Sequence, residues 1–343
     1  MMVRATVGMV VLGLVTMTVA ANAQSGGHLL VAEKTSQSIK IVDPAAGKVI
    51  AAVREGEPQG KDTGHEVAAS LDGKFAYAPV YGDSGVGKPG TDGRNMVVID
   101  IASHKLVGNV DFGHGVRPHC AVVAPPMAGF PEGVLYVTTE LDKTVSIIDP
   151  KTLKIVGTVP TGSEESHMLA ITHDGRWGYT ANVGPGTVSV LDLKARKVVK
   201  IIPIAKTTQR ISVSMDDKMA FTSDQTKPEL DVIDTATNTV KARVPLASYG
   251  YGTASTPDGH WLLVPMMDVN KVAVVDLKTL TVTKNIDLAA GTHPQEALVR
   301  PDGKAAYVSC DHSGQVAEID PATWTVRRMI DTGKVSDGLA WAK

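Results

Sequence analysis

Residues 135–149 read LYVTTELDKTVSIID: two short apolar strands rich in β-branched residues, joined by a polar turn and ended by Asp149. The end of this pattern recurs along the chain, because a short apolar strand that closes with Asp occurs seven times, about 42 to 57 residues apart. The seven strand ends are Asp43, Asp100, Asp149, Asp192, Asp234, Asp276 and Asp320. Self-similarity at such a period predicts a repeat architecture.

Each repeat unit contains signals for four strands. Another β-branched strand follows each Asp turn, and a further strand precedes 135–138 and its equivalents. In most units a tight turn such as Asp72-Gly73 or Asp174-Gly175 separates the first two strands, and Asp-Gly between apolar runs is a strong hairpin signal. Four short strands repeated seven times predict an all-β fold, a seven-bladed β-propeller with four-stranded blades.

The two ends of the repeat region complement each other. The first unit begins at Leu29 without a preceding inner strand, and the last segment, Ser336 to Trp341, has the character of that missing strand. Pairing the C-terminal strand with the N-terminal blade would remove two open sheet edges at once. We therefore expect the ring to be closed by this pair.

The sequence resembles the YVTN-type β-propeller repeat proteins. The resemblance rests on Tyr136-Val137-Thr138-Thr139, on Tyr179-Thr180-Ala181-Asn182, on the Val-Ile-Asp strand ends and on the segment from Asp234 to Val240. It covers essentially all of the mature chain and implies the same fold. Similar propellers include surface-layer and periplasmic binding proteins, sugar lactonases and the haem-binding propeller of cytochrome-type nitrite reductases, so the resemblance leaves the activity open.

The N-terminus has the layout of a secretory signal. Arg4 precedes an apolar run from Val7 to Val19, and Ala21-Asn22-Ala23 supplies small residues before Gln24. We expect residues 1–23 to be a signal peptide and residues 24–343 to form one propeller domain, located in the periplasm or secreted. No further apolar stretch is long enough to predict a membrane span in the mature chain.

The composition narrows the range of partners. The formal net charge is −2, with acidic and basic residues well mixed, so there is no basic footprint for nucleic acid. Cys120 and Cys310 fall in different repeats and are expected to be separate thiols. The expected partner is a small polar or anionic ligand, or a periplasmic protein, and the chain is expected to be a monomer.

Residues that differ between the repeats are the candidates for function, because the repeated Asp residues are expected to cap turns. Counting back seven residues from each Asp-Gly turn, or aligning by strand, reaches the start of every innermost strand. This ring of positions contains Asp337, His65, His119, His167, Gln209, Tyr251 and Gln295. The residues that follow them are Gly338, Glu66, Cys120, Met168, Arg210, Gly252 and Glu296. Since side chains alternate along a strand, we expect the first set to face the channel and Glu66, Arg210 and Glu296 to lie at its margin, unless the strands start with a bulge.

Three histidines from adjacent blades are the sharpest feature of this ring. His65, His119 and His167 could ligate a divalent metal ion with open coordination positions, and no more specific cofactor is indicated. The same side chains could instead surround a polar ligand without metal, or water alone. An insertion from about Pro79 to Asn95, rich in glycine and carrying Lys88, is expected to cover this mouth of the channel.

Three functions fit these residues. The favoured one is an exported protein that binds a small polar ligand or a partner through the ring, with Glu296 and Arg210 contributing. The first alternative is a metal-dependent lyase or lactonase acting on a sugar acid or lactone, in which Tyr251, Arg210 and Glu66 are the candidate catalytic residues. The second is a haem- or copper-linked redox partner with histidine ligation, although a motif for covalent c-type haem is absent from the sequence.

Overall fold

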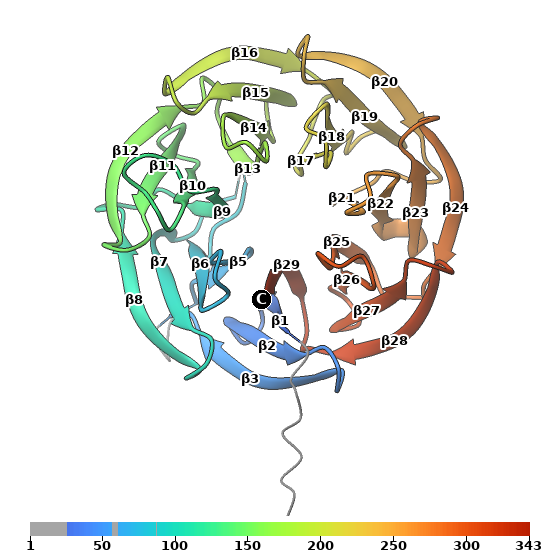
Figure 1. The fold of residues 1–343 in the computed structure, drawn as a ribbon, viewed down its shortest axis with the longest axis horizontal. Coiled ribbons are helices and arrows are strands. Elements are labelled where there is room, and N and C mark those ends of the chain that lie inside the picture. The colour runs from blue at the N-terminus through green and yellow to red at the C-terminus, as the bar shows by residue number, and fades with distance from the viewer. Residues whose placement is uncertain (1–25, 57–60, 87) are drawn as a thin grey trace, which may run out of the picture.

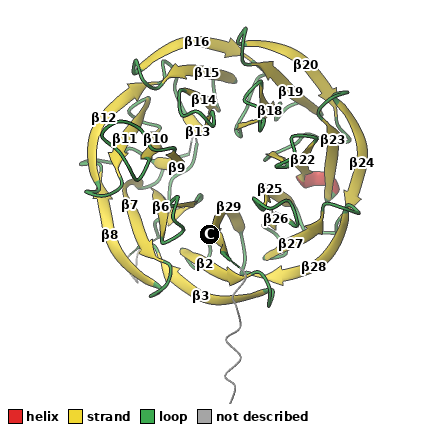
Figure 2. Cartoon of the chain, viewed as in Figure 1, coloured by secondary structure: helices red, strands yellow, loops and turns green. Residues whose placement is uncertain are grey.

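The computed structural model describes residues 26–56, 61–86 and 88–343. These residues form seven antiparallel sheets arranged in a ring (Figure 1), which confirms the predicted seven-bladed β-propeller. Apart from strands and loops, the described part of the chain contains the short 3-10 helix η1 (Met267–Val269), shown in red in Figure 2. Within the same residues, no helix has the length and hydropathy needed to cross a bilayer. The predicted signal peptide, 1–23, lies outside the described residues.

Each sheet runs from an innermost strand beside the axis to an outermost strand at the perimeter (Figure 1). Blade 1 contains β29 (Ser336–Ala342), β1 (His28–Glu33), β2 (Ser38–Asp43) and β3 (Lys48–Arg54). Blade 2 contains β4 (Thr63–Gly64), β5 (Ala68–Ala69), β6 (Phe75–Gly82), β7 (Asp92–Asp100) and β8 (Lys105–Asp111). Blade 3 contains β9 (Pro118–Ala124), β10 (Val134–Thr139), β11 (Thr144–Asp149) and β12 (Lys154–Pro160). Blades 4 and 5 contain β13 (Ser166–Ile171), β14 (Trp177–Asn182), β15 (Thr187–Asp192) and β16 (Lys197–Pro203); and β17 (Ser212–Val213), β18 (Met219–Ser223), β19 (Glu229–Asp234) and β20 (Thr239–Pro245). Blades 6 and 7 contain β21 (Ala254–Ser255), β22 (Trp261–Met266), β23 (Lys271–Asp276) and β24 (Thr281–Asp287); and β25 (Pro294–Val299), β26 (Ala306–Cys310), β27 (Gln315–Asp320) and β28 (Thr325–Asp331).

The repeated Asp residues cap turns, as the sequence predicts. Asp43 Oδ1 accepts a hydrogen bond from the backbone N–H of Ala45 at 2.8 Å, and Asp149 accepts one from Lys151 at 2.9 Å. The equivalent residues in the other five blades are Asp100, Asp192, Asp234, Asp276 and Asp320, and each accepts a backbone N–H two or three residues ahead. Each carboxylate thus satisfies amides that the turn leaves without a strand partner.

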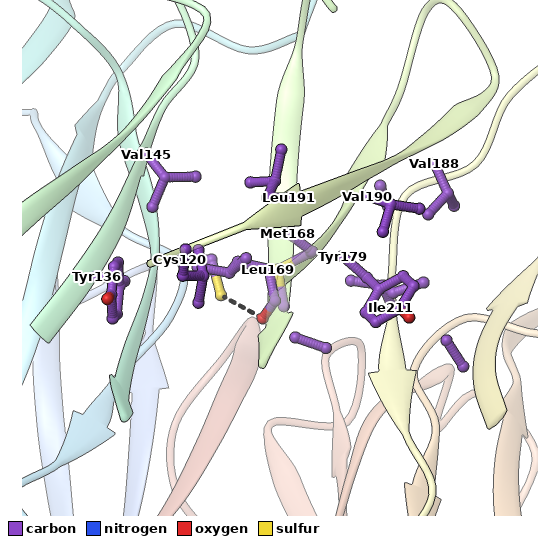
Figure 3. Close-up of a cluster of buried hydrophobic side chains, with 14 of the residues drawn as sticks. Cys120, Tyr136, Val145, Met168, Leu169, Tyr179, Val188, Val190, Leu191 and Ile211 are labelled. Atoms are coloured by element: carbon purple, nitrogen blue, oxygen red, sulfur yellow. Dashed lines mark hydrogen bonds between the residues drawn. The ribbon is translucent and has the colours of Figure 1, made fainter. Parts of the chain in front are cut away.

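Apolar side chains between neighbouring blades form the core. Figure 3 shows one such layer, where Tyr136 and Val145 of blade 3 lie across from Met168 and Leu191 of blade 4. Because the middle strands of each blade are covered on both faces, they read as continuous apolar runs rather than as an alternating pattern. Cys120 is a buried free thiol in this layer, and Cys310 is a second one in blade 7, so the prediction of separate thiols is confirmed.

The ring closes between the two ends of the chain. Strand β29 pairs antiparallel with β1, with Leu29 opposite Trp341 and Val31 opposite Leu339. Blade 1 is therefore completed by the C-terminal strand, as predicted, and β1 is paired on both sides instead of being left as an open edge.

Irregular pairing occurs where several innermost strands begin, and it decides how the ring residues point. The register between β13 and β14 shifts between Ser166 and Met168, which places His167 in the shift. The same break occurs around His119 in β9, around Gln295 in β25 and around Asp337 in β29. Since a bulge interrupts the alternation of side chains, a ring residue and its successor can both face the channel.

Candidate functional site

A cavity of about 260 Å³ lies where the innermost strands begin, at the predicted mouth of the channel. The ring residues that line it are His65, His119, His167, Gln209, Tyr251 and Asp337, joined by Arg210. Lys34, Tyr81, Gly85, Val86 and Lys88 complete the lining. The structure therefore brings seven of the nine predicted ligand-binding residues into one pocket.

Three imidazoles and one phenol form an aromatic cluster on one side of the cavity. The His119 and His167 rings lie 3.5 Å apart between centroids and tilted by 31°, and the His65 ring stacks on Tyr81 at 4.9 Å. His65 and Tyr81 each meet His119 edge-on at 5.3 Å. Burial lowers the pKa of His65 to about 3 and that of His119 well below its usual value, so both rings are neutral.

His119 is exposed to only 1% and neither of its ring nitrogens has a hydrogen-bond partner within the described residues. Leaving a buried polar group unpaired costs about 1–3 kcal/mol. The terminal nitrogens of Arg210, by contrast, contact Glu66 and Asp337, although its Nε also lacks a partner within the described residues. Both ring nitrogens of His119 are therefore buried without a partner among the described residues.

His167 is held from behind by a buried carboxylate. Its Nδ1 contacts Glu140 Oε1, while the other oxygen of Glu140 accepts a hydrogen bond from the Tyr81 hydroxyl at 2.7 Å. Its Nε2 lies 3.4 Å from the amide nitrogen of Gln209 in the pocket. A carboxylate behind an imidazole fixes the orientation and the tautomer of the ring.

Arg210 reaches across the channel and joins blade 5 to three other blades. From blade 5, its guanidinium contacts Glu66 of blade 2, lies 2.7 Å from Asp337 of blade 1 and lies 3.1 Å from Glu296 of blade 7. Its charge also lies over the Tyr251 ring at 4.9 Å. Arg210 is 2% exposed, so the expectation that it would lie at the margin was wrong; the irregular starts of the inner strands allow the residue after the ring position to turn inward.

Two of the carboxyl groups around Arg210 hold their protons more tightly than usual. Burial raises the pKa of Glu66 to about 8 and that of Glu296 to about 7, although the attraction of Arg210 opposes the shift. Asp337 behaves differently, because its contacts with Lys34 at 2.7 Å and with Arg210 outweigh burial and lower its pKa. The lining thus combines one ionised carboxylate, Asp337, with the cations of Lys34, Lys88 and Arg210.

The insertion of blade 2 covers the pocket, as the sequence predicts. Gly85, Val86 and Lys88 line the cavity from the loop between β6 and β7. Arg117 holds this loop, since its Nε donates to Asp92 at 2.6 Å and its two terminal nitrogens donate to the carbonyls of Gly85 and Lys88 at 3.1 and 3.3 Å.

Three predicted residues lie beside the cavity rather than in its lining. Glu66 and Glu296 contact Arg210, and Gln295 donates to Asp311 at 2.6 Å. Sequence reasoning missed Lys34 and Glu140, each of which directly follows the second strand of its blade. Their position could have been found, because those strands end beside the starts of the innermost strands.

Metal binding by His65, His119 and His167 stays a prediction. Within the described ranges, the one group of at least three His, Cys, Asp or Glu side chains with ligand atoms within 4.8 Å of one another is His293, Asp311 and His312. That group lies outside the cavity lining.

The fold and the site define a seven-bladed propeller with a polar pocket at one channel mouth, and the sequence places it in a family. The model of the cytochrome D1 heme domain matches residues 131–343, and the chain belongs to this family. A dihydro-heme d1 dehydrogenase of Pseudomonas aeruginosa is 26% identical over 212 residues, which is 59% of this chain. The chain spans 43% of the length of that relative.

Solved structures show the same fold at low identity. A functionally unknown protein from Desulfotomaculum acetoxidans has a TM-score of 0.74 at 12% identity, covering 92% of this chain and 99% of its own. A hydrazine synthase from Kuenenia stuttgartiensis has a TM-score of 0.67 at 17% identity, covering 83% and 93%. The dihydro-heme d1 dehydrogenase NirN in complex with DHE has a TM-score of 0.63 at 14% identity, covering 91% and 74%.

The family match and the pocket overlap only in part. The lining residues within the matched segment are His167, Gln209, Arg210, Tyr251 and Asp337. The other seven, which include His119 and the covering loop, come from residues before 131. Much of the pocket is therefore built by the part of the chain that the family model leaves unmatched.

Proposed function

We propose that this propeller binds a small anionic ligand, of the size of a sugar acid, in the pocket at the channel mouth. The observation that carries the proposal is the buried, neutral and unpartnered imidazole of His119, inside a cavity whose cations outnumber its carboxylates. Lys34, Lys88 and Arg210 would attract the anion, and His119 would contribute a hydrogen bond that the protein itself does not use.

The size of the cavity argues for a small molecule rather than for the haem in the family name. Drug-sized ligands occupy pockets of roughly 300–1,000 Å³, and haem is larger than most of them. The cavity of about 260 Å³ lies just below that range. The imidazoles would suit iron as donors, but a haem would have to extend beyond this cavity, so the space does not fit the group.

Calorimetry and thermal shift with the untagged chain test the proposal. The probes are gluconate, citrate, oxalate and phosphate, with glucose as the neutral counterpart. An anion at one hundred times its Kd would stabilise the fold by about 2.7 kcal/mol. His119→Phe should weaken binding at least tenfold, whereas His173→Phe, at an exposed position paired with Asp217, should leave it unchanged.

Two outcomes would contradict the proposal. One is that none of the anions binds, or that the best of them binds His119→Phe as tightly as the natural chain. The other is saturable one-to-one binding of hemin, with a Soret shift that His119→Phe abolishes, which would assign the site to haem.

Catalysis is the second candidate, and the Glu140–His167 pair favours it. A buried imidazole oriented by a carboxylate, with its other nitrogen in the pocket, is suited to act as a general base. A lactonase or lyase would use His167 to move a proton while Arg210 and Tyr251 hold the substrate carboxylate. Tyr251 would hold the substrate carboxylate together with Arg210, because the guanidinium lies over the Tyr251 ring and both residues line the cavity.

Turnover assays on sugar lactones and uronates, with and without added divalent ions, separate the two candidates. His167→Gln should reduce the rate at least a hundredfold while leaving ligand affinity within a few-fold, because general-base catalysis typically contributes about 10²–10⁴ in rate. Absence of turnover with every lactone and uronate tested, in a chain that binds a member of the anion panel, would leave binding as the function.

A further inference from the structure

A cluster of side chains of the types that ligate metals lies in blade 7, outside the pocket at the channel mouth (the mouth pocket). His293 precedes β25, and Asp311 and His312 follow β26, so the antiparallel pairing of these strands brings the three together. His293 Nδ1 is 2.6 Å and His312 Nε2 is 3.8 Å from the same oxygen, Asp311 Oδ1. The two imidazole rings are stacked at 3.9 Å and 7°.

The repeat does not require these side chains. In five blades the same backbone hydrogen bond occurs beside the ring. A backbone amide just after the second strand donates to the carbonyl of the residue two positions before the ring residue. Asp311 donates to His293 in this way, and Lys34 donates to Val335. The corresponding pairs in blades 3, 4 and 5 are Glu140 to Arg117, Val183 to Glu165 and Gln225 to Thr207. The same backbone hydrogen bond therefore carries unrelated side chains. Of these five pairs of bonded positions, only the pair in blade 7 consists of an imidazole and a carboxylate.

The cluster is also held in place by residues around it. Gln295 Nε2 donates to the second oxygen of Asp311 at 2.6 Å, which leaves Oδ1 facing the histidines. The backbone N–H of His293 donates to Asn270 Oδ1 at 3.0 Å, which helps to fix the residue in the left-handed conformation with φ of 54°. Support of this kind around the ligands is what orients donors in metal sites.

We propose that His293, Asp311 and His312 bind a divalent transition metal ion such as Zn²⁺. Two imidazole nitrogens and one carboxylate oxygen suit Zn²⁺, Ni²⁺ and Cu²⁺, and three protein ligands leave coordination positions for water or another ligand. The Asp311 carboxylate is 10% exposed, whereas the side chain of His312 is 62% exposed. The open positions would therefore face solvent on the same side of the propeller as the mouth pocket.

Binding requires a small rearrangement that the exposure of His312 permits. Parallel rings cannot both direct a nitrogen at one ion, so the rings must tilt apart, and the ion must replace the hydrogen bond between His293 Nδ1 and Asp311 Oδ1. His312 can move because it packs on His293 from the solvent side, whereas His293 and Asp311 keep their backbone and Gln295 contacts. This site does not depend on the function proposed for the mouth pocket.

Calorimetric titration of Zn²⁺ into the untagged chain, after dialysis against EDTA, tests the site. We expect one Zn²⁺ per chain, weakened at least tenfold in His312→Ala and in Asp311→Asn. Gln295→Ala should weaken binding about 10–100-fold by loosening Asp311. His114→Ala is the matched control, because His114 is an exposed histidine that contacts a single carboxylate, Asp142, at 2.9 Å.

The result that would overturn the proposal is the absence of stoichiometric Zn²⁺ binding at pH 7.5, or binding that His312→Ala leaves unchanged. If the ion is instead lost in His119→Phe and kept in His312→Ala, it occupies the mouth pocket and not blade 7. Electron paramagnetic resonance with Cu²⁺ gives an independent readout, since nitrogen coupling should decrease in His312→Ala while the fold stays intact.

Discussion

At the scale of single residues, the buried and unpartnered imidazole of His119 should cost stability in the free protein. The ring is buried and both nitrogens lack partners, so the fold gains nothing from its polarity. Replacing such a group with an apolar one of similar shape can be neutral or stabilising. We expect His119→Phe to raise the free energy of unfolding by about 1 kcal/mol, measured by urea denaturation at pH 7.5. A loss of 2 kcal/mol or more would show that the imidazole has a stabilising partner.

The same variant has a pH signature. Because the pKa of His119 is lowered in the fold, the unfolded chain takes up a proton below about pH 6.5 that the folded chain does not. This proton uptake lowers the free energy of unfolding of the natural protein as the pH falls, whereas His119→Phe removes the titrating group and with it this effect. The advantage of His119→Phe should grow between pH 7.5 and pH 5. A constant difference in unfolding free energy over that range would contradict a neutral His119.

At the scale of elements, the covering loop depends on Arg117. One planar guanidinium binds Asp92, Gly85 and Lys88 at once, and a lysine ammonium cannot reproduce three contacts of that geometry. Arg117→Lys should therefore increase amide hydrogen exchange in residues 83–86 and 88–92 about tenfold and weaken anion binding, with little change in melting temperature. Unchanged exchange would mean that the loop is held by its own turn contacts. Lys143→Arg, at an exposed ion pair, is the control.

The closing strand makes a tight contact that only glycine allows. The N–H of Gly338 donates to the carbonyl of His65 at 2.9 Å, and a Cβ at this position would lie 2.6–2.7 Å from Glu66 and from that carbonyl. We expect Gly338→Ala to cost roughly 1–3 kcal/mol, read from urea denaturation. Gly56→Ala should be tolerated, because among the described residues its Cβ would meet a single atom, at 3.7 Å. Equal stability of the two variants would show that the seam between blades 1 and 2 is loose.

At the scale of the whole molecule, the fold and the site differ in how far the sequence predicts them. The blades and their closure follow from local signals repeated seven times, and the ring positions follow from the repeat register. Contacts such as Glu140 to His167 could not be predicted, because they depend on the reach of side chains between blades. The inward turn of Arg210 was missed for a different reason. Regular alternation was favoured over a bulged start, whereas the pairing around Arg210 is irregular, with Thr208 opposite Asp224 and Ser212 opposite Phe221.

The ionic cluster around Arg210 ties distant parts of the ring together and should make stability depend on pH. Arg210 of blade 5 faces Glu66 of blade 2, Asp337 of blade 1 and Glu296 of blade 7, so opening the ring would separate all of them. The pKa of Glu66 is raised to about 8 by burial, which means that the folded chain keeps a proton that the unfolded chain loses above about pH 4.5.

The part of the unfolding free energy that comes from the proton kept by Glu66 is therefore complete at low pH and is lost as the pH rises towards 8. Glu66→Gln keeps the shape of the protonated acid and cannot ionise, so the melting temperature of the natural chain, relative to this variant, should fall by several degrees between pH 5 and pH 8.5. Glu132→Gln, at an exposed site, should show no such trend. If the difference between the natural chain and Glu66→Gln stays constant over this range, Glu66 is ionised beside Arg210 throughout, and the cluster acts as a fixed ion pair.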